Sequence, residues 1–241
     1  MITSMAGLDV QVLQHSQATP VAAVILCHGF GAPGDDLVPL AQELIDREPG
    51  LTAVRFYVPA APISLGSTGW GEARAWWPIN LPTVARLQAG DPTALREFSL
   101  AEPHGMPVAR QALLKLIDEV CVATKLPRSR VLLGGFSQGA MLATDVALRL
   151  EEAPLGLSIL SGTLLMEDVW GPKARARAGL QVFQTHGKSD PILAFVGAVW
   201  LNELLTQSGM HVQFEPFEGG HTIHPDALMK LGAFISRRVN A

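Results

Sequence analysis

The sequence predicts an α/β protein, with a mostly parallel central sheet of six to seven strands and helices on both faces. Short runs rich in Val, Ile and Leu alternate with longer segments of helical period, as in strands joined by crossover helices. The 241 residues are 48% hydrophobic and 17% charged, with Gly and Pro spread along the chain, which argues against disorder. We therefore expect one domain over residues 1–241, built on one large core.

Six short apolar runs have the length and composition of buried strands. In chain order they span residues 21–27, 53–58, 131–134, 156–160, 180–185 and 212–216. A seventh run, over residues 10–14, is predicted to be an outer strand.

Five segments of helical period lie between or after these runs, over residues 37–47, 108–124, 138–151, 192–207 and 225–238. The last has clear start and stop signals. Pro225 is tolerated in a first turn, and Asp226 suits the positive end of the helix dipole. Arg237 and Arg238 suit the negative end, so a helix is predicted between them.

The segment 61–107 breaks this alternation. It contains three of the five tryptophans, many prolines and only one short helical pattern, over residues 92–98. Irregular segments of this length inside a compact domain are usually functional or disordered, and the aromatic content favours function. We expect a wall or lid over a cleft; the alternative is a hydrophobic cluster packed on the sheet edge.

Composition excludes several classes of function. The longest apolar run is far shorter than the ~20 residues that span a bilayer, and no basic segment followed by an apolar core indicates a secretory signal, so a cytoplasmic location is expected. The net charge is -4, and the basic residues at 173–177 alternate with alanine, which is typical of a solvent-exposed helix surface. We therefore expect no nucleic-acid partner.

Metal and disulfide chemistry also have no signature in the sequence. Cys27 and Cys121, the two cysteines, are expected to be buried thiols without a disulfide framework. No H-E-x-x-H motif or Cys/His cluster is present, so no metal and no cofactor are predicted. A homodimer is one assembly open to the chain, and the sequence does not decide it.

The stretch GFSQG at residues 135–139 carries the first indication of catalysis. It matches G-x-S-x-G, the sharp turn that exposes a serine between a strand and a helix. An apolar run precedes it and a helical pattern follows it, which is the context that the motif needs. Ser137 is therefore the candidate nucleophile.

Serine also needs a base and an acid that orients the base, in the chain order Ser, Asp or Glu, His. Asp190 follows the run 180–185 and His221 follows the run 212–216, so all three residues fall at carboxyl ends of parallel strands. Two alternatives stand beside this interpretation. Asp190 also suits a helix cap, and His224 is a rival base that Pro225 would hold at a helix entry.

An oxyanion hole requires backbone N–H donors close to the serine. In this arrangement they come from the residue after the nucleophile, Gln138, and from the loop after the early strand. That loop is the glycine-rich stretch 27–36, and the N–H of Phe30 is the predicted second donor. The same stretch lacks the P-loop and dinucleotide-binding patterns.

These residues resemble a known family, the small α/β-hydrolase carboxylesterases that include acyl-protein thioesterases and lysophospholipase-like enzymes, and particularly its bacterial branch. The matching stretches are LCHGFGAPGDDLVPLA, PAAPIS followed by GW and AWW, LLGGFSQGAMLA, LSGTLL, THGKSDPIL and FEGGHTIHPDAL. The resemblance implies a catalytic Ser137, Asp190 and His221, and oxyanion amides at Phe30 and Gln138. It also implies an active-site tryptophan at Trp76 and an acyl pocket lined by SGTLL.

The sequence thus predicts a serine carboxylesterase that hydrolyses short-to-medium acyl esters, or thioesters, of small molecules without a cofactor. The candidate residues for an apolar acyl wall are Leu65, Trp70, Trp76, Trp77, Leu164, Leu165 and Met166. Pro78 and the long segment that follows it depart from the family pattern, which leaves substrate preference open. The alternatives are an acyl-protein thioesterase, a lysophospholipase, or a ligand-binding protein of slow turnover on the same scaffold.

Overall fold

A computed structural model describes residues 1–15 and 18–241 of the chain. Its main sheet has the strand order β1-β2-β4-β3-β7-β8-β9-β10. The strands are β1 (Ile2–Met5), β2 (Leu8–Leu13), β3 (Ala22–Cys27), β4 (Val54–Pro59), β7 (Val131–Phe136), β8 (Gly156–Leu160), β9 (Gln181–Gly187) and β10 (His211–Phe217). The strands from β4 to β10 in this order are parallel, and β1 and β2 pair antiparallel.

The predicted α/β class with a mostly parallel sheet is confirmed. Each predicted strand has a counterpart, but the described sheet has eight strands, because β1 extends the antiparallel edge. β1 contains Thr3 and Ser4 and buries none of its residues, so it lacks the apolar signal of the other strands.

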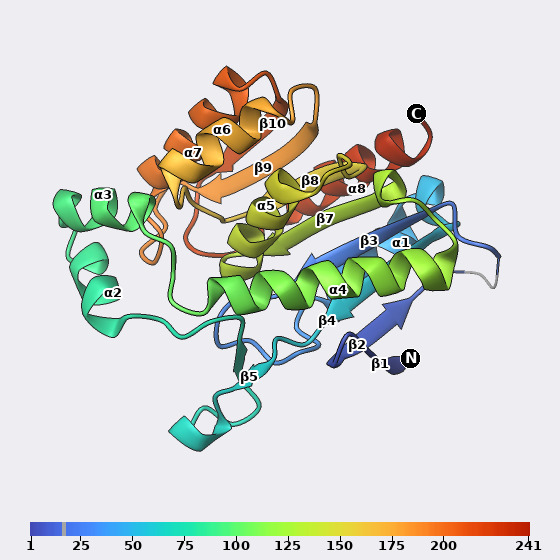
Figure 1. Cartoon of the computed structure of the whole chain (residues 1–241), viewed down its shortest axis with the longest axis horizontal. Coiled ribbons are helices and arrows are strands. Elements are labelled where there is room, and N and C mark those ends of the chain that lie inside the picture. The colour runs from blue at the N-terminus through green and yellow to red at the C-terminus, as the bar shows by residue number, and fades with distance from the viewer. Residues whose placement is uncertain (16–17) are drawn as a thin grey trace.

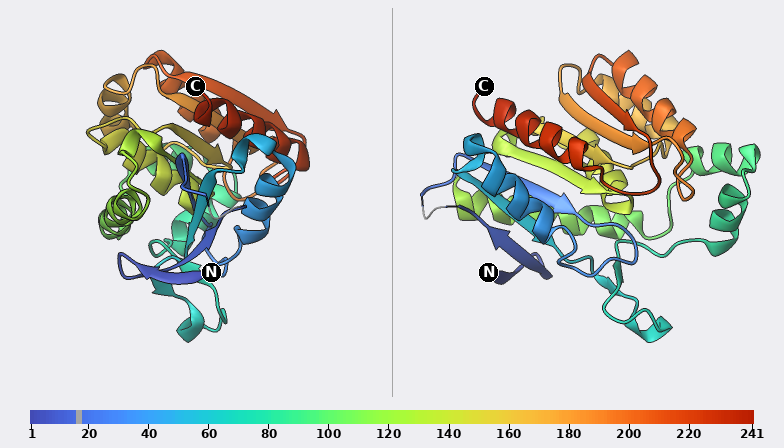
Figure 2. Two further views of the ribbon diagram at one scale, coloured as in Figure 1. Left: turned by 90° about the vertical axis from the view of Figure 1, so that its right-hand side faces the viewer. Right: turned by 180° about the vertical axis from the view of Figure 1, so that it is seen from behind.

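Helices cover both faces of the sheet (Figure 1). α1 (Val38–Arg47) and α8 (Pro225–Val239) lie side by side on one face, as the right-hand view of Figure 2 shows. The other face is covered by α4 (Met106–Thr124), α5 (Gln138–Arg149), α6 (Glu167–Arg175) and α7 (Phe195–Gln207). Single turns η1 (Pro49–Leu51) and η3 (Arg128–Arg130) precede β4 and β7.

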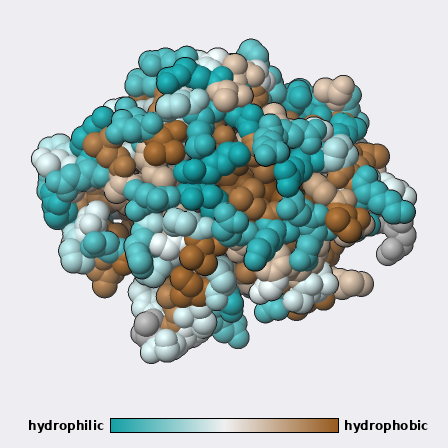
Figure 3. All heavy atoms as spheres, viewed as in Figure 1, coloured by the Kyte–Doolittle hydropathy of each residue, from teal (hydrophilic) through white to brown (hydrophobic). Residues whose placement is uncertain are grey.

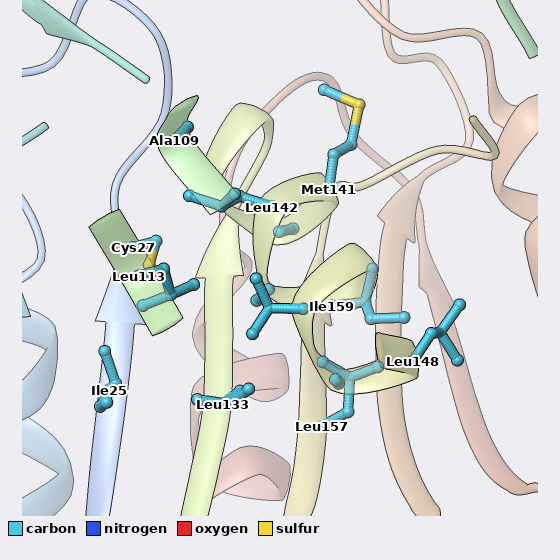
Figure 4. Close-up of a cluster of buried hydrophobic side chains, with 14 of the residues drawn as sticks. Ile25, Cys27, Ala109, Leu113, Leu133, Met141, Leu142, Leu148, Leu157 and Ile159 are labelled. Carbon is cyan, nitrogen blue, oxygen red and sulfur yellow. The ribbon is translucent and has the colours of Figure 1, made fainter. Parts of the chain in front are cut away.

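The core is divided by the sheet into two layers, which explains the uninterrupted apolar runs of the parallel strands. In β3, Ile25 and Cys27 face α4 and α5, whereas Val24 and Leu26 face α1 and α8. All four side chains are buried. Figure 4 shows part of the first layer, to which Ile25 and Cys27 of β3 and Leu113 of α4 belong.

The segment 61–107 contains a small two-stranded sheet, β5 (Ile63–Ser64) with β6 (Arg74–Ala75), the turn η2 (Gly66–Thr68), and two helices, α2 (Leu81–Gln88) and α3 (Pro92–Leu100). The single helix expected at 92–98 is α3, so the prediction missed α2. Asn80 caps α2, yet the helix buries none of its residues, so it lacks the apolar face by which helices are found in sequences. The segment lies beside the carboxyl ends of the parallel strands (Figure 1).

The surface gives no sign of a membrane span. Within the described residues, no helix combines the length and the hydrophobicity needed to cross a bilayer. On the face drawn in Figure 3, hydrophilic side chains separate small apolar patches.

Candidate active site

Ser137 occupies a sharp turn between the end of β7 and the start of α5. Its backbone has φ 53° and ψ -117°, a conformation that is rare for any residue other than glycine. Its N–H donates to the carbonyl of Leu160 at 2.9 Å, and the residue is 8% exposed. The local fold therefore matches the strand–turn–helix context predicted for the GFSQG stretch.

Gly135 and Gly139 allow this turn to pack against the end of β3. A Cβ atom at Gly139 would lie 2.0 Å from the carbonyl oxygen of Cys27, and one at Gly135 would lie 2.5 Å from the same oxygen. Such contacts are impossible for real side chains, so only glycine permits the approach.

The structure brings the three predicted catalytic side chains together. His221 Nε2 lies 2.8 Å from Ser137 Oγ, and His221 Nδ1 lies 2.6 Å from Asp190 Oδ2. The three residues follow β7, β9 and β10, whose carboxyl ends share one edge of the sheet. His224 instead caps α8, where its Nδ1 accepts from the N–H of Asp226 at 3.2 Å.

Asp190 faces His221, as the triad requires, and the alternative of a helix cap was wrong, because α7 begins at Phe195 with Ala194 at its N-cap and no side-chain cap bond. Its Oδ1 accepts from the N–H groups of Ile192 and Leu193 at 2.8 and 2.9 Å, while Oδ2 faces His221. Burial by itself would raise the pKa of Asp190, but hydrogen bonds from His186, His221 and the Leu193 amide outweigh burial and hold this pKa well below its usual range. The carboxylate is therefore charged at neutral pH.

His186 is a second histidine that contacts Asp190. It is fully buried, and its Nε2 lies 2.8 Å from the carbonyl oxygen of Leu193 and 3.2 Å from Asp190 Oδ2. Because both neighbours are acceptors, Nε2 carries the proton. His186 therefore donates to Oδ2, the carboxylate oxygen that also faces His221, whereas the amides donate to Oδ1.

The loops that carry Asp190 and His221 are joined to each other. Ser189 donates both its N–H and its hydroxyl to the carbonyl of Gly219, at 3.0 and 2.9 Å. The hydroxyl of Ser161 donates to the carbonyl of Thr222 at 3.1 Å. These bonds fix the imidazole and the carboxylate in one frame.

The predicted oxyanion donors are the N–H groups of Phe30 and Gln138. Neither donates to an acceptor elsewhere in the described part of the chain. The loop that holds Phe30 lies against the serine, because a Cβ atom at Gly29 would be 3.4 Å from Ser137 Cβ. The N–H of Gln138, the residue after Ser137, and the N–H of Phe30, in the loop against Ser137, thus have no acceptor among the described residues, and their role as oxyanion donors stays a prediction.

His28 holds the loop that contains Phe30 in place through hydrogen bonds of its ring and its carbonyl group. Its Nε2 accepts from the N–H of Ala61 at 3.0 Å, so the proton of the neutral ring is on Nδ1, which donates to the Gly29 carbonyl at 2.8 Å. Burial lowers the pKa of His28. The carbonyl of His28 accepts from the indole N–H of Trp76 at 3.0 Å, which ties the loop to the segment 61–107.

The side chain of Gln138 has a role that the sequence did not reveal. Its Oε1 accepts from the N–H of Trp76 at 2.9 Å, and its Nε2 donates to the carbonyl of Trp77 at 2.8 Å. The Gln138 side chain is buried, and the oxygen and nitrogen of its amide group form one bond each. It therefore fixes the tryptophan pair to the start of α5.

The seven residues expected to form an acyl wall differ in their exposure. Five of them have at most 4% exposure and belong to the core: Trp76, Trp77, Leu164, Leu165 and Met166. Leu65 is half-buried. Trp70 is 57% exposed, and its ring makes an edge contact with Phe30 at 5.9 Å between centroids. The acyl wall stays a prediction.

Metal chemistry has no candidate ligands here: within residues 1–15 and 18–241, no three His, Cys, Asp or Glu side chains are grouped so as to hold an ion. Cys27 is a free, buried thiol, as predicted, whereas Cys121 is free but only half-buried, so the prediction of a buried thiol was wrong for Cys121. Burial raises the pKa of the Cys27 thiol far above its usual range, so it is unreactive.

Comparison with known proteins decides the family. The profile of the phospholipase/carboxylesterase family matches residues 8–239. The chain belongs to this family. As a member, it is a hydrolase of carboxylic esters with the α/β-hydrolase fold, and the predicted resemblance is confirmed.

Individual relatives agree with this assignment. Acyl-protein thioesterase 1 of Eremothecium gossypii is 29% identical over 223 residues, which cover 91% of this chain and 88% of the relative. Acyl-protein thioesterase 1 of Mycosarcoma maydis is 27% identical, with 94% and 95% covered. The crystal structure of esterase PE8 has a TM-score of 0.79 and 26% identity, with 95% of this chain and 98% of that chain covered. The Bacillus cereus carboxylesterase, at 18% identity, TM-score 0.67 and coverage of 96% and 94%, shares the fold.

Proposed function

We propose that the chain is a serine carboxylesterase in which Ser137, His221 and Asp190 act as a catalytic triad. His221 Nε2 takes the proton of Ser137 Oγ as this oxygen attacks the carbonyl carbon of an ester. Asp190 holds the imidazole in the tautomer with a proton on Nδ1 and stabilises the imidazolium that forms. The observation that carries the proposal is the pair of hydrogen bonds from His221, 2.8 Å to the serine and 2.6 Å to the aspartate.

The remaining steps follow from the same groups. The N–H groups of Phe30 and Gln138 stabilise the negative oxygen of the tetrahedral intermediate. The bond to the leaving group then breaks, and the leaving oxygen or sulfur takes the proton from His221. Water, activated by the same imidazole, attacks the acyl-enzyme and releases the acid. No step requires a cofactor.

A test of the triad is the replacement Ser137→Ala, which should lower kcat for ester hydrolysis by a factor of about 10⁶, to the background rate. Ser129→Ala is the matched control, because Ser129 lies in η3 at the opposite end of β7. It should retain the native rate. Most of the native activity in Ser137→Ala, with an intact circular dichroism spectrum, would overturn the assignment.

For the substrate we propose esters of short-to-medium acyl chains that bind beside the tryptophans of the segment 61–107. In this proposal the segment is a wall or lid over the site, and the whole chain is a single domain. Turnover of p-nitrophenyl esters from two to sixteen carbons tests this, and equal rates across the series would refute it. The cytoplasmic location stays a prediction.

The second candidate is a thioesterase, and the curated relatives named acyl-protein thioesterase 1 favour it. Comparing an S-acyl with an O-acyl substrate of the same chain length separates the two. A lysophospholipase would be indicated by release of fatty acid from a lysophospholipid. Labelling by a fluorophosphonate without turnover above background would instead indicate a binding protein that retains the triad.

A further inference from the structure

A groove of about 460 Å³ lies beside His221, on the sheet face covered by α1 and α8. His221 and Phe136 form one wall, and their ring centroids are 4.8 Å apart. The starts of α1 and α8, which lie side by side in the right-hand view of Figure 2, form the remainder. The groove therefore borders the imidazole of His221.

The direction of proton transfer assigns a role to this groove. In the proposed reaction His221 gives the leaving oxygen or sulfur the proton that it took from Ser137. A general acid must lie within hydrogen-bond reach of the atom that it protonates. The leaving group, and not the acyl chain, is thus the part of the substrate that must lie on the imidazole side, where the groove is.

The lining has an apolar floor and an acidic rim. Leu37, Leu40, Ile223 and Leu228 supply the apolar surface. Asp36 and Glu43 are the charged side chains beside them, and no Lys or Arg is among the described lining residues. Glu43 pairs with Arg47 of the same helix at 3.1 Å, whereas Asp36 is exposed and forms no ion pair with a described residue.

Two helix N-termini meet at the groove, and by themselves they would favour an anion. Each already has a carboxylate: Asp36 lies just before α1, and Asp226 lies in the first turn of α8. These carboxylates offset the positive ends of the helices in part, and the charged carboxylates that line the groove, Asp36 and Glu43, face no Lys or Arg among the described lining residues.

We propose that this groove binds the leaving group of the substrate and favours alcohols or thiols with an apolar body that ends in a positive charge. The inference rests on the proposed serine mechanism and adds to it a substrate class. Choline esters are the simplest members of that class, since their ethyl stem ends in a trimethylammonium group.

The experiment compares butyrylcholine with 3,3-dimethylbutyl butyrate, in which a tert-butyl group replaces the trimethylammonium group at the same size. The two alcohols differ in intrinsic reactivity, so the readout is the ratio of their kcat/KM values in each variant. Asp36→Asn should lower this ratio roughly 1.5- to fivefold, the range expected for an exposed charge pair. The drop should shrink in 0.5 M NaCl, because salt screens exposed charges.

Asp46→Asn is the matched control, because it removes the same charge from an exposed position of α1 outside the groove. It should leave the ratio unchanged. A second variant tests the apolar floor: Leu40→Trp narrows the groove and should slow 3,3-dimethylbutyl butyrate at least fivefold more than ethyl butyrate.

If the ratio of kcat/KM values is the same in Asp36→Asn as in the native enzyme, Asp36 does not attract the positive charge of the leaving group and this part of the proposal is overturned. Equal effects of Leu40→Trp on the two neutral esters would overturn the groove as a leaving-group site. If either of these results is found and Ser137→Ala is inactive, the groove proposal fails but the proposed triad is retained. An active Ser137→Ala would instead overturn the serine mechanism itself.

Discussion

Asp145 should be the most sensitive charged position for stability, because three donors from three helices converge on its buried carboxylate. Arg149 and the indole of Trp170 donate to Oδ1 at 2.8 and 2.9 Å, and Arg110 donates to Oδ2. The Asp145 side chain has 0% exposure and that of Arg110 has 12%. Glu102 also pairs with Arg110, at 2.7 Å, so the cluster ties α4, α5 and α6 to the end of the 61–107 segment.

Asp145→Ala leaves a largely buried guanidinium without its main counterion. Breaking a buried pair in this way costs about 3–5 kcal/mol of unfolding free energy. For a chain of this size that corresponds to a fall in Tm of about 6–20 °C. Ser137 lies eight residues earlier on α5, or roughly 12 Å away along the helix, so kcat at low temperature should fall far less than stability.

The assay is urea denaturation followed by tryptophan fluorescence and circular dichroism. Asp118→Ala is the matched control, because Asp118 and Arg128 form an exposed pair, with side chains 55% and 34% accessible, and such pairs contribute at most about 1 kcal/mol. A loss of less than about 1 kcal/mol in Asp145→Ala, or a loss equal to that of the control, would refute the reasoning.

Two further predictions concern the packing and the titration of residues below the site. Gly139→Ala should lower the unfolding free energy by at least about 2 kcal/mol and abolish activity, since its Cβ would overlap the backbone of Cys27. Gly171→Ala in α6 is the control, because its Cβ would have no neighbour nearer than 3.9 Å, and it should be neutral or stabilising in the same urea titration. His28 is neutral in the fold because burial lowers its pKa, so it contributes stability that is present above pH ~6.5 and lost as pH falls below that value. His28→Gln should flatten the decline of unfolding free energy between pH 7 and 5 by up to about 1.4 kcal/mol per pH unit, and the exposed His211→Gln should not; equal slopes would contradict the assignment.

The central parallel strands were predictable because they are buried on both faces, which produces continuous apolar runs such as that of β3, whereas the edge strand β10 has no fully buried residue. Ser137, Asp190 and His221 were predictable because each follows a predicted strand, and carboxyl ends of parallel strands share one edge. β1 and α2 were not, since neither buries a residue, and burial is what creates a periodic pattern.

Other features of the site depend on tertiary contacts that no local pattern encodes. His186 acts through a carboxylate in the following loop, and Gln138 through backbone groups of the distant pair Trp76 and Trp77. Likewise, the sequence indicates that the tryptophans are apolar and clustered, but not that Trp76 lies in the core while Trp70 projects to solvent.

The most direct test of the triad is the site of covalent attack by a fluorophosphonate, read by intact-protein mass spectrometry and peptide mapping. One adduct on the peptide that contains Ser137, formed at least a hundredfold more slowly in His221→Gln, is the predicted result, because the imidazole activates the hydroxyl. An unlabelled native enzyme, an adduct on another residue, or an unchanged rate in His221→Gln would contradict it.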